Sequence, residues 1–393
     1  MKIAVFIKST TFHKTYGGME TQNKLLCEEL ARRGYQVTVF SPQLELTISD
    51  KNEFGVRYEF INCDYTNSLL SFINPNSWFK KSYDHFIKQD TERNFDIIIS
   101  QSSAALGVIK RRRFVKASII SISHGTTISE YKSYLSSAKS LKSYLRFVPN
   151  TLYTLRNFFG RQREFIHGSD VNVAVSNFVK TNLINETFVE ENKVIVINNG
   201  IDPNPFEKFQ RTFKTARNLK VMYSGRVDRS KGVFQLLRLA KKFPELQINF
   251  YGTGDAYEDL SKQVMKDSIN NVVMHGKVLY KDMVAKYFEN DVLVLPTIRV
   301  EGLPMVIIEA QFSKLPIIAS DMGGITDAIK NGKTGLLINA GDFEDLADKI
   351  KILMSSMETR KKVSEGAYNF ATENFTITKM TDRYEQIIRK LRK

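Results

Sequence analysis

Two glutamates stand eight positions apart in the stretch VEGLPMVIIEA, Glu301 and Glu309. The apolar run DVLVLPT before them predicts a strand. Pro304 suits the first turn of a following helix, because its missing N–H would be unpaired there anyway. Glu301 is then expected in the loop and Glu309 one to two turns into the helix.

A helix N-terminus between two carboxylates would offer N–H groups and positive potential to a phosphate. A carboxylate also accepts the paired hydrogen bonds of a diol well. A sugar nucleotide carries hydroxyls at one end, a diphosphate in the middle and a ribose diol at the other. The pair therefore predicts a sugar-nucleotide site, and the alternative is a capping Glu301 with a half-buried, structural Glu309.

Two cations five positions apart, Arg226 and Lys231, occur in YSGRVDRSKG after another expected strand. Arginine supplies a planar fork of donors and lysine a compact charge. Gly225 and Gly232 leave the backbone free to approach a ligand. The loop suits a diphosphate, although an ordinary solvated loop has the same composition.

Other motifs add one weak signal and exclude several chemistries. GGME places Gly17 and Gly18 before a helix, where the backbone could receive an anion or only form a turn. In YGTGDAY, Tyr257 takes the third glycine position of the dinucleotide fingerprint, which argues against a nicotinamide or flavin site. Ser176 lacks the G-x-S-x-G setting of a hydrolase nucleophile. The histidines, at 13, 85, 124, 167 and 275, show no metal-ligand spacing, so no metal is expected.

Short runs rich in valine and isoleucine alternate with longer helical patterns along the chain, as in βα units. Strands are expected at KIAVFIKS, YQVTVFS, VRYEFI, FDIIIS, ASIISIS, DVNVAVS and KVIVINNG, and again at KVMYSG, LQINFYG, NVVMHGK, VLVLP, LPIIAS and TGLLI. Helices are expected at METQNKLLCEELARRG, VFQLLRLAKKF, YEDLSKQVMKD, KDMVAKYFEN, MVIIEAQF and FEDLADKIKILMSS. The predicted fold class is α/β, with two doubly wound, Rossmann-like domains facing across a cleft.

A chain of 393 residues with 42% hydrophobic and 25% charged residues suits two globular domains. The seam is expected at 198–220, a stretch with Asn-Asn-Gly, two prolines and no regular period. The predicted boundaries are 1–200 for the first domain, 201–375 for the second and 376–393 for a basic amphipathic helix.

The net charge of +15 is spread unevenly, because residues 110–163 hold twelve lysines and arginines against Glu130 alone. Nucleic acid, anionic lipid and phosphorylated substrates all suit such a patch. Within it, SYLRFVPNTLYTLRNFFGRQREF interleaves arginine with aromatic residues and leucine, as interfacial helices on anionic lipid do. We expect this segment to dock on the cytoplasmic leaflet; a solvated basic face is the alternative. The residues assigned to the acceptor or membrane are Arg111, Arg112, Arg113, Lys142, Arg146 and Arg156.

Targeting signals are weak. MKIAVFIKSTTF is interrupted by Lys8 and lacks a cleavage site, so no signal peptide is expected. No apolar stretch reaches ~18 residues, so no membrane span is expected. Cys27 and Cys63 are expected to be free thiols in a reducing compartment. The expected location is cytoplasmic, peripheral on the inner face of the cell membrane.

Taken together, these motifs resemble the family-4 (group 1) retaining glycosyltransferases of the GT-B fold. The resemblance covers nearly the whole chain and keeps the family's order, through GGMETQNKLLCEELARRGYQVTVF, SISHG, VSNFVKTNL, VIVINNGID, GRVDRSKG, EGLPMVIIEA and GGITDAIKNGKTGLLI. Of these, EGLPMVIIEA is the family's E-x7-E signature.

The resemblance implies transfer of a hexose or N-acetylhexosamine from a UDP- or GDP-linked donor to a hydroxyl of a glycan or lipid-linked acceptor. It implies retention of configuration, no bound metal, and a role in cell-surface polysaccharide or glycolipid synthesis. The first domain would bind the acceptor, the second would bind the nucleotide sugar, and the last helix would pack back toward the first domain.

Site residues follow from the same resemblance. Arg226 and Lys231 would clamp the diphosphate, Glu309 would hold the ribose and Glu301 the donor sugar. Gly18 would approach the phosphates, and His124 in SISHG would lie near the anomeric carbon. The catalytic set is Glu301, His124, Arg226 and Lys231. The donor-binding set is Gly17, Gly18, Gly225, Arg226, Lys231, Glu301, Gly302, Leu303, Pro304 and Glu309.

Two positions depart from the family's pattern. Lys314 stands where a glycine is common, and a left-handed conformation would cost a lysine about 1 kcal/mol, so this helix is expected to end differently. Asp327 stands where glutamate is common. Two other functions stay open: a sugar-nucleotide epimerase or hydrolase of the same fold, and a basic nucleic-acid-binding protein, which no motif supports. Nucleic acid is therefore not an expected partner.

Overall fold

The computed structural model describes residues 1–14, 16–65, 74–137, 147–214 and 218–392, which form two compact units. The first unit comprises Met1–Tyr131, Ser140–Asn199 and Ile377–Lys393, and the second comprises Lys132–Lys139 and Gly200–Thr376. Lys132–Lys139 thus groups with the second unit, although the predicted boundaries placed these residues in the first. The helix near the C-terminus groups with the first unit.

In the part of the chain that the structure describes, the first unit holds an eight-stranded sheet with the order β3-β4-β2-β1-β5-β6-β7-β8. Its pairings are parallel except for the antiparallel pair β3 and β4. The strands are β1 (Lys2–Phe6), β2 (Gln36–Pro42), β3 (Lys51–Glu53), β4 (Val56–Ile61), β5 (Ile97–Gln101), β6 (Ser118–Ser123), β7 (Val171–Ala174) and β8 (Val194–Val196).

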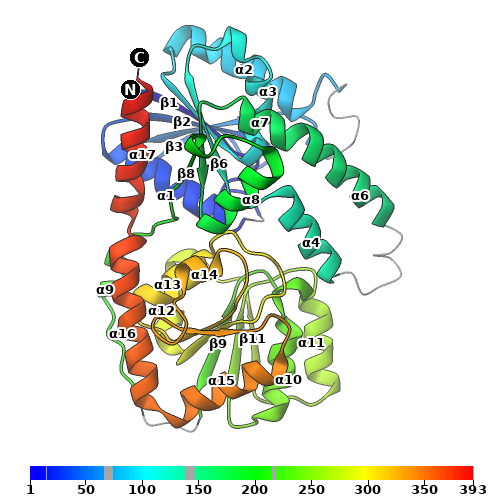
Figure 1. Cartoon of the computed structure of the whole chain (residues 1–393), viewed down its shortest axis with the longest axis vertical. Helices are drawn as coiled ribbons and strands as arrows, with labels where there is room; N and C mark the ends of the chain where they lie inside the picture. Colours follow the sequence, from blue (N-terminus) through cyan, green and yellow to red (C-terminus); the bar gives the residue numbers. More distant parts are fainter. Residues whose placement is uncertain (15, 66–73, 138–146, 215–217, 393) are drawn as a thin grey trace. The chain divides into compact units, whose positions relative to one another are not determined.

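Helices flank this sheet on both sides (Figure 1). They are α1 (Gly18–Arg32), α2 (Trp78–Arg93), η1 (Ser102–Ala105), α3 (Leu106–Ile109), η2 (Arg112–Phe114), α4 (Thr127–Ser137), α6 (Phe147–Arg156), the π-helical η3 (Asn157–Gln162), α7 (Arg163–His167), α8 (Asn177–Thr187), η4 (Glu191–Lys193) and α17 (Ile377–Leu391). Residues 132–137 of α4 count with the second unit.

The second unit holds a parallel sheet with the order β11-β10-β9-β12-β13-β14. Its strands are β9 (Lys220–Ser224), β10 (Gln247–Tyr251), β11 (Val272–Gly276), β12 (Val292–Leu295), β13 (Ile317–Ser320) and β14 (Leu336–Ile338). Its helices are α9 (Asn204–Glu207), η5 (Arg229–Lys231), α10 (Val233–Lys242), α11 (Tyr257–Lys266), α12 (Tyr280–Glu289), α13 (Met305–Phe312), α14 (Ile325–Ala328), α15 (Phe343–Ser355) and α16 (Met357–Asn374).

The predicted α/β class is confirmed, and burial explains why it could be predicted. All four residues of β12 are buried, as are all four of β13, because helices cover both faces of a parallel sheet. In α10 the buried residues include Leu236, Leu237 and Ala240, which share one helical face. The short antiparallel β3, with the sequence KNE, was missed because it carries no apolar period.

The end of α13 corrects one expectation. Lys314 has a φ of +51°, so this lysine adopts the left-handed conformation. The helix was expected to end in a different way that avoids this conformation. Its N–H donates to the Gln311 carbonyl and the Leu315 N–H to the Ala310 carbonyl, which is the Schellman pattern. The Lys314 ammonium lies 4.5 Å from the centre of the Tyr368 ring, and this contact offsets part of the backbone cost.

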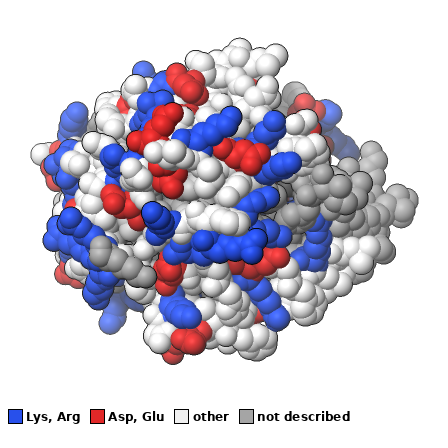
Figure 2. Space-filling view, turned by 90° about the horizontal axis from the view of Figure 1, so that it is seen from above, with Lys and Arg blue, Asp and Glu red and all other residues white. Residues whose placement is uncertain are grey.

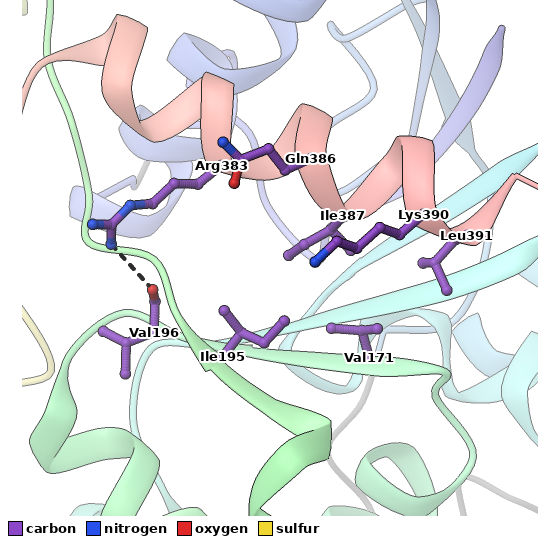
Figure 3. Close-up of a pocket in the computed structure, with 8 residues that line it drawn as sticks. All are labelled: Val171, Ile195, Val196, Arg383, Gln386, Ile387, Lys390 and Leu391. Atoms are coloured by element: carbon purple, nitrogen blue, oxygen red, sulfur yellow. Dashed lines mark hydrogen bonds between the residues drawn. The ribbon is translucent and has the colours of Figure 1, made fainter.

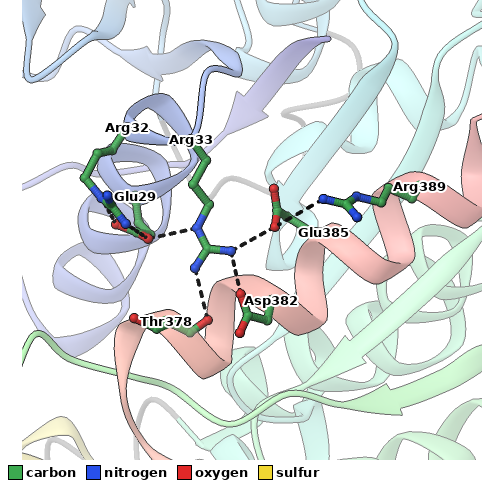
Figure 4. Close-up of polar contacts among 7 residues, drawn as sticks. All are labelled: Glu29, Arg32, Arg33, Thr378, Asp382, Glu385 and Arg389. Atoms are coloured by element: carbon green, nitrogen blue, oxygen red, sulfur yellow. Dashed lines mark hydrogen bonds and ion pairs between the residues drawn. The ribbon is translucent and has the colours of Figure 1, made fainter.

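Helix α17 is tied to α1 by an ionic network inside the first unit (Figure 4). The Arg33 guanidinium contacts Asp382 at 2.6 Å, Glu385 at 2.8 Å and Glu29 at 2.8 Å. Only 14% of the Arg33 side chain is exposed, so these contacts are screened less than surface ion pairs. The network and the buried face of α17, which includes Tyr384 and Ile388, fix the helix on the first unit.

A groove of 280 Å³ lies between α17 and the strands β7 and β8 (Figure 3). Its lining is Val171, Ile195, Val196, Arg383, Gln386, Ile387, Lys390 and Leu391. Arg383 donates to the Val196 carbonyl at 3.4 Å across one end of the groove. Within the described residues, no helix combines the length and the apolar character that crossing a bilayer requires.

Candidate functional site

The strand order of the second sheet reverses between β9 and β12, which is the topological switch point of the sheet. These two strands are neighbours although β10 and β11 separate them in the chain. Counted from β9, its order is that of a doubly wound nucleotide-binding sheet, 3-2-1-4-5-6. Ligands of such sheets bind beyond the carboxyl ends of the two strands at the reversal. Residues 225–232 and 296–304 follow these two strands, so both main predicted motifs lie at the reversal point.

The loop after β9 is packed against the loop after β12. Gly232 has a φ of +72°, and a Cβ there would lie 1.8 Å from the Pro296 carbonyl oxygen. The Ile298 N–H donates to the Ser230 carbonyl at 2.9 Å. Glycine is therefore required at position 232 by both conformation and space.

Lys231 and Glu301 meet directly across these two loops. The Lys231 ammonium donates to Glu301 Oε1 at 2.5 Å, and the side chains are 18% and 12% exposed. The Thr297 hydroxyl donates to the same oxygen at 3.3 Å. The structure thus places a shielded lysine and a shielded carboxylate together where the fold binds its ligands.

A third loop, after β13, holds the backbone of Glu301. The Gly324 N–H donates to the Glu301 carbonyl at 2.8 Å. Gly323 has a φ of +60°, and a Cβ there would lie 2.4 Å from that carbonyl oxygen. The Gly-Gly pair in the sequence was a signal for this close approach, but neither glycine was assigned to the site.

Helix α13 coincides with the predicted run MVIIEAQF, but the expected position of Pro304 in its first turn is wrong. Pro304, with a φ of −68° and a ψ of 122°, is the residue before the helix and not part of its first turn. Gly302 and Leu303 precede it, and Leu303 and Pro304 are buried. Glu309 lies in the second turn of α13, which agrees with the predicted position.

Glu309 is 8% exposed and accepts a hydrogen bond from the Tyr287 hydroxyl of α12 at 2.5 Å. Burial raises the pKa of the Glu309 carboxyl above its usual range, and the Tyr287 hydrogen bond opposes part of that rise. Sequence reasoning missed Tyr287; its one signal was that a buried tyrosine hydroxyl needs a polar partner.

Arg226 differs from Lys231 in exposure. Its side chain is 55% exposed and contacts Asp228 at 3.2 Å. Burial works to raise the pKa of Asp228, but the hydrogen bonds from Ser230 and the charges of Arg226 and Arg299 outweigh it, so the pKa lies below its usual range. A charged Asp228 therefore anchors the loop and restrains Arg226 while leaving its guanidinium accessible.

The glycines of YGTGDAY pack against the same loop. A Cβ on Gly252 would lie 2.0 Å from the Gly225 carbonyl oxygen, and one on Gly254 would lie 2.5 Å from the Val227 carbonyl oxygen. The Gly225 N–H donates to the Tyr251 carbonyl at 3.0 Å. These glycines serve close packing beside the predicted site, which explains a G-x-G without a dinucleotide fingerprint.

The remaining donor-site predictions fall in the first unit. Gly17 is the residue before α1 and Gly18 its first residue, both exposed, so the predicted loop ends at Gly17. The Gly17 N–H donates to the Glu20 carboxylate at 2.8 Å. His124 follows β6 and contacts Gln101 at 2.8 Å, and Gln101 donates to Asn23 of α1 at 2.9 Å. Burial lowers the pKa of His124 to about 4, so its imidazole is neutral at pH 7.

The basic segment gives a mixed result. Arg111 donates to the Gly107 carbonyl and lies 4.5 Å from the Tyr83 ring centre, and Arg112 pairs with Asp170 at 2.9 Å. These two cations hold local structure, whereas Arg113 is exposed beside Phe114. Lys142 and Arg146 lie outside the described residues, and Arg156 is at the end of α6. Figure 2 shows Lys and Arg interspersed with Asp and Glu on the face it presents.

Among residues 1–14, 16–65, 74–137, 147–214 and 218–392, no three histidines, cysteines or carboxylates are gathered as metal ligands would be. The two cysteines are free, Cys27 buried and Cys63 partly buried.

Comparison of the sequence with family profiles identifies the family of this chain. The profile described as Glycosyltransferase Family 4 matches residues 16–205, and the one described as Glycosyl transferases group 1 matches residues 205–370. The chain belongs to the family-4, group 1 glycosyltransferases. The two profiles meet inside the predicted seam and divide the chain much as the two units do.

Relatives agree with this membership. An uncharacterized glycosyltransferase of Methanocaldococcus jannaschii is 25% identical over 99% of both chains. A 41.2 kDa protein encoded in the cps region of Klebsiella pneumoniae is 31% identical over 51% of this chain, and the capsular polysaccharide biosynthesis glycosyltransferase CapM of Staphylococcus aureus is 28% identical over 52%. The chain matches only 56% and 57% of the length of those two relatives.

Solved structures share the fold. Sucrose-phosphate synthase of Thermosynechococcus elongatus matches with a TM-score of 0.81 and 17% identity over 99% of this chain and 98% of that one. HepE of Anabaena, solved with UDP and glucose, matches with a TM-score of 0.76 and 17% identity over 99% of this chain and 100% of its own. The fold is GT-B.

Proposed function

We propose that this chain transfers a sugar from a nucleotide-sugar donor to a hydroxyl of a glycan or lipid-linked acceptor, with retention of configuration. One observation carries the proposal: Lys231 and Glu301 meet where the sheet of the second unit reverses, and Glu309 is buried in the helix that follows. Family membership supports the transfer reaction. The UDP in the HepE structure supports a nucleotide-sugar donor, and the capsular role in CapM's name supports a glycan pathway.

The proposed roles follow the chemistry of a nucleotide sugar. Arg226 and Lys231 hold the diphosphate, with Gly225 leaving the backbone room to approach. Glu301 contacts the donor sugar and Glu309 the ribose diol. Residues 302–304 bring the N-terminal N–H groups of α13 toward a phosphate, as the helix dipole favours. Gly17, Gly18 and His124 of the first unit complete the proposed set.

The reaction needs charge stabilisation more than proton chemistry. The acceptor oxygen bonds to the anomeric carbon as the bond from that carbon to the phosphate oxygen breaks. The leaving phosphate oxygen takes the acceptor proton, and the nucleoside diphosphate departs. Arg226 and Lys231 stabilise the negative charge as it gathers on the diphosphate. The neutral imidazole of His124 can accept or donate a hydrogen bond beside the sugar without adding charge. The same residues account for the reaction without a metal ion, which we also propose.

A panel of nucleotide sugars tests the donor. UDP-linked hexoses and N-acetylhexosamines and GDP-mannose are compared by thermal denaturation without acceptor. At ~100 times its Kd, the true donor should stabilise the protein by about 2.7 kcal/mol. Failure of every nucleotide sugar to raise the Tm would contradict the proposal. Rapid nucleotide release without acceptor would favour an epimerase or hydrolase instead.

A cluster of aromatic rings around Arg163 supports the proposed membrane contact. The guanidinium carbon lies 5.3, 5.5 and 5.3 Å from the ring centres of Phe158, Phe159 and Phe188. Phe159 is 64% and Phe188 75% exposed. A cation among exposed rings suits an anionic bilayer interface. We propose that this cluster docks the enzyme on the cytoplasmic leaflet, where a lipid-linked acceptor lies.

Phe188→Ser should weaken binding to vesicles containing phosphatidylserine by about 5- to 10-fold, or ~1–1.4 kcal/mol, because one ring no longer enters the interface. Co-sedimentation measures the change. Phe54→Ser is the matched control, since Phe54 is also left-handed, with a φ of 49°, and 71% exposed. Equal losses in both variants, or equal binding of the wild type to neutral vesicles, would end the membrane proposal.

A further inference from the structure

Arg211 lies in the segment between α9 and β9 and binds three backbone carbonyls. Its Nε donates to Ser313 at 2.8 Å, one terminal nitrogen to Asn290 at 2.8 Å, and the other to Tyr287 at 2.5 Å. The first carbonyl ends α13 and the other two end α12, where helices leave carbonyls without intrahelical partners. Burial lowers the pKa of Arg211 to about 10, so it still carries its charge at pH 7.

These three bonds close a ring of contacts through the donor site. Tyr287 offers its carbonyl to Arg211 and its hydroxyl to Glu309. The Ser313 N–H donates to the Glu309 carbonyl at 3.1 Å, and the Ser313 carbonyl accepts from Arg211. The backbones of α12 and α13 are therefore joined by one guanidinium, and their side chains by one hydrogen bond to the Glu309 carboxylate.

We propose that Arg211 is a positioning residue of the donor site: by bridging the ends of α12 and α13 it sets the Tyr287–Glu309 pair and so aims the Glu309 carboxylate at the nucleotide. This inference rests on the proposed donor-binding role of Glu309. Arg211 does not itself touch Glu309, so its effect passes through the helix ends. A carboxylate that is displaced by well under 1 Å from its binding position holds the nucleotide less tightly.

Arg360 of α16 provides a matched control. Its guanidinium is also buried, with the residue 2% exposed, and also binds backbone carbonyls, those of Leu353 in α15 and Lys214. Lys214 belongs to the same connecting segment as Arg211. Arg360 therefore shares the structural task of Arg211, but its two carbonyl partners belong to α15 and to this segment.

The test compares Arg211→Lys, Arg360→Lys and Glu309→Gln, alone and combined, at a temperature where each is folded by circular dichroism. Lysine keeps the charge, but its compact ammonium replaces the planar fork that spans the three carbonyls. Arg211→Lys should raise the Kd for UDP, or for GDP if the donor panel selects it, about 10-fold. Arg360→Lys should lower the Tm and leave that Kd unchanged. Combined with Glu309→Gln, the effect of Arg211→Lys on the Kd should largely vanish, because both changes weaken the same contact between residue 309 and the nucleotide.

Three results would overturn the inference. An unchanged Kd in Arg211→Lys while Glu309→Gln weakens binding would refute the positioning role and leave the donor site standing. Full additivity of Arg211→Lys and Glu309→Gln would do the same. An unchanged Kd in Glu309→Gln would remove the proposed role of Glu309, and the positioning role with it. If Arg211→Lys is too unstable to assay, Tyr287→Phe opens the same ring at its hydroxyl, and the same non-additivity with Glu309→Gln is required.

Discussion

Alanine at Arg226 or Lys231 is expected to lower kcat/KM by roughly 10- to 1000-fold, ~1.4–4 kcal/mol of transition-state stabilisation. Both cations follow β9 at the reversal of the second sheet, where the departing diphosphate would gather charge. Lys231 is the more enclosed, 18% exposed against 55% for Arg226. We expect its loss to be the larger, since charges act more strongly where water is excluded.

Initial rates with saturating acceptor and varied donor measure the effect. Arg229→Ala is the control, because Arg229 lies in the same loop, is 53% exposed and pairs with Asp259 at 2.6 Å. It should retain nearly full kcat/KM. Near-wild-type turnover in both Arg226→Ala and Lys231→Ala would show that the diphosphate is held elsewhere.

Glu309→Gln is expected to weaken donor binding while making the unliganded protein more stable at alkaline pH. Glutamine keeps a partner for the Tyr287 hydroxyl but loses the charge that favours a ribose diol, which costs about 1.5–3 kcal/mol, roughly 10- to 100-fold in Kd. The stability gain has a separate cause. Burial raises the folded-state pKa of the Glu309 carboxyl, so ionising it opposes folding.

The pH dependence follows from the direction of that shift. The protonated carboxyl contributes its full stability below the pKa of the unfolded chain, about 4.3. This contribution is lost as the pH rises through the higher folded-state pKa. The Tm of Glu309→Gln should therefore match the wild type near pH 4 and exceed it near pH 8. Glu289→Gln, an exposed position on α12, should change neither Tm nor Kd. A Tm difference that does not vary with pH would refute the assigned cause.

Much of the second unit could be predicted because its strands and helices are locally consistent. MVIIEAQF coincides with α13, Met305–Phe312, and the loop positions of Arg226, Lys231 and Glu301 follow from where the apolar strands end. Parallel strands bring their carboxyl ends to one edge, so motifs far apart in sequence become neighbours. The contact between Lys231 and Glu301 is the result.

Other features depend on tertiary contacts that no local pattern carries. Tyr287 is one apolar-face residue among several in α12 until its hydroxyl is seen to bind Glu309. Lys314 was expected to avoid a left-handed conformation, yet the Schellman bonds and the Tyr368 ring hold it there. Arg211 gave no signal at all, since its partners are backbone carbonyls, which every sequence supplies.

The placement of α17 has a consequence for how the chain is made on the ribosome. Gly200–Thr376 of the second unit is synthesised before residues 377–391, which complete the first. Until α17 emerges, Arg33 lacks the carboxylates of Asp382 and Glu385, and α1 lacks the helix that packs beside it. Domains usually finish folding in the order of their synthesis. Here the unit that begins first is finished last, so a nascent chain stalled before residue 377 would expose an incomplete first unit to chaperones and proteases.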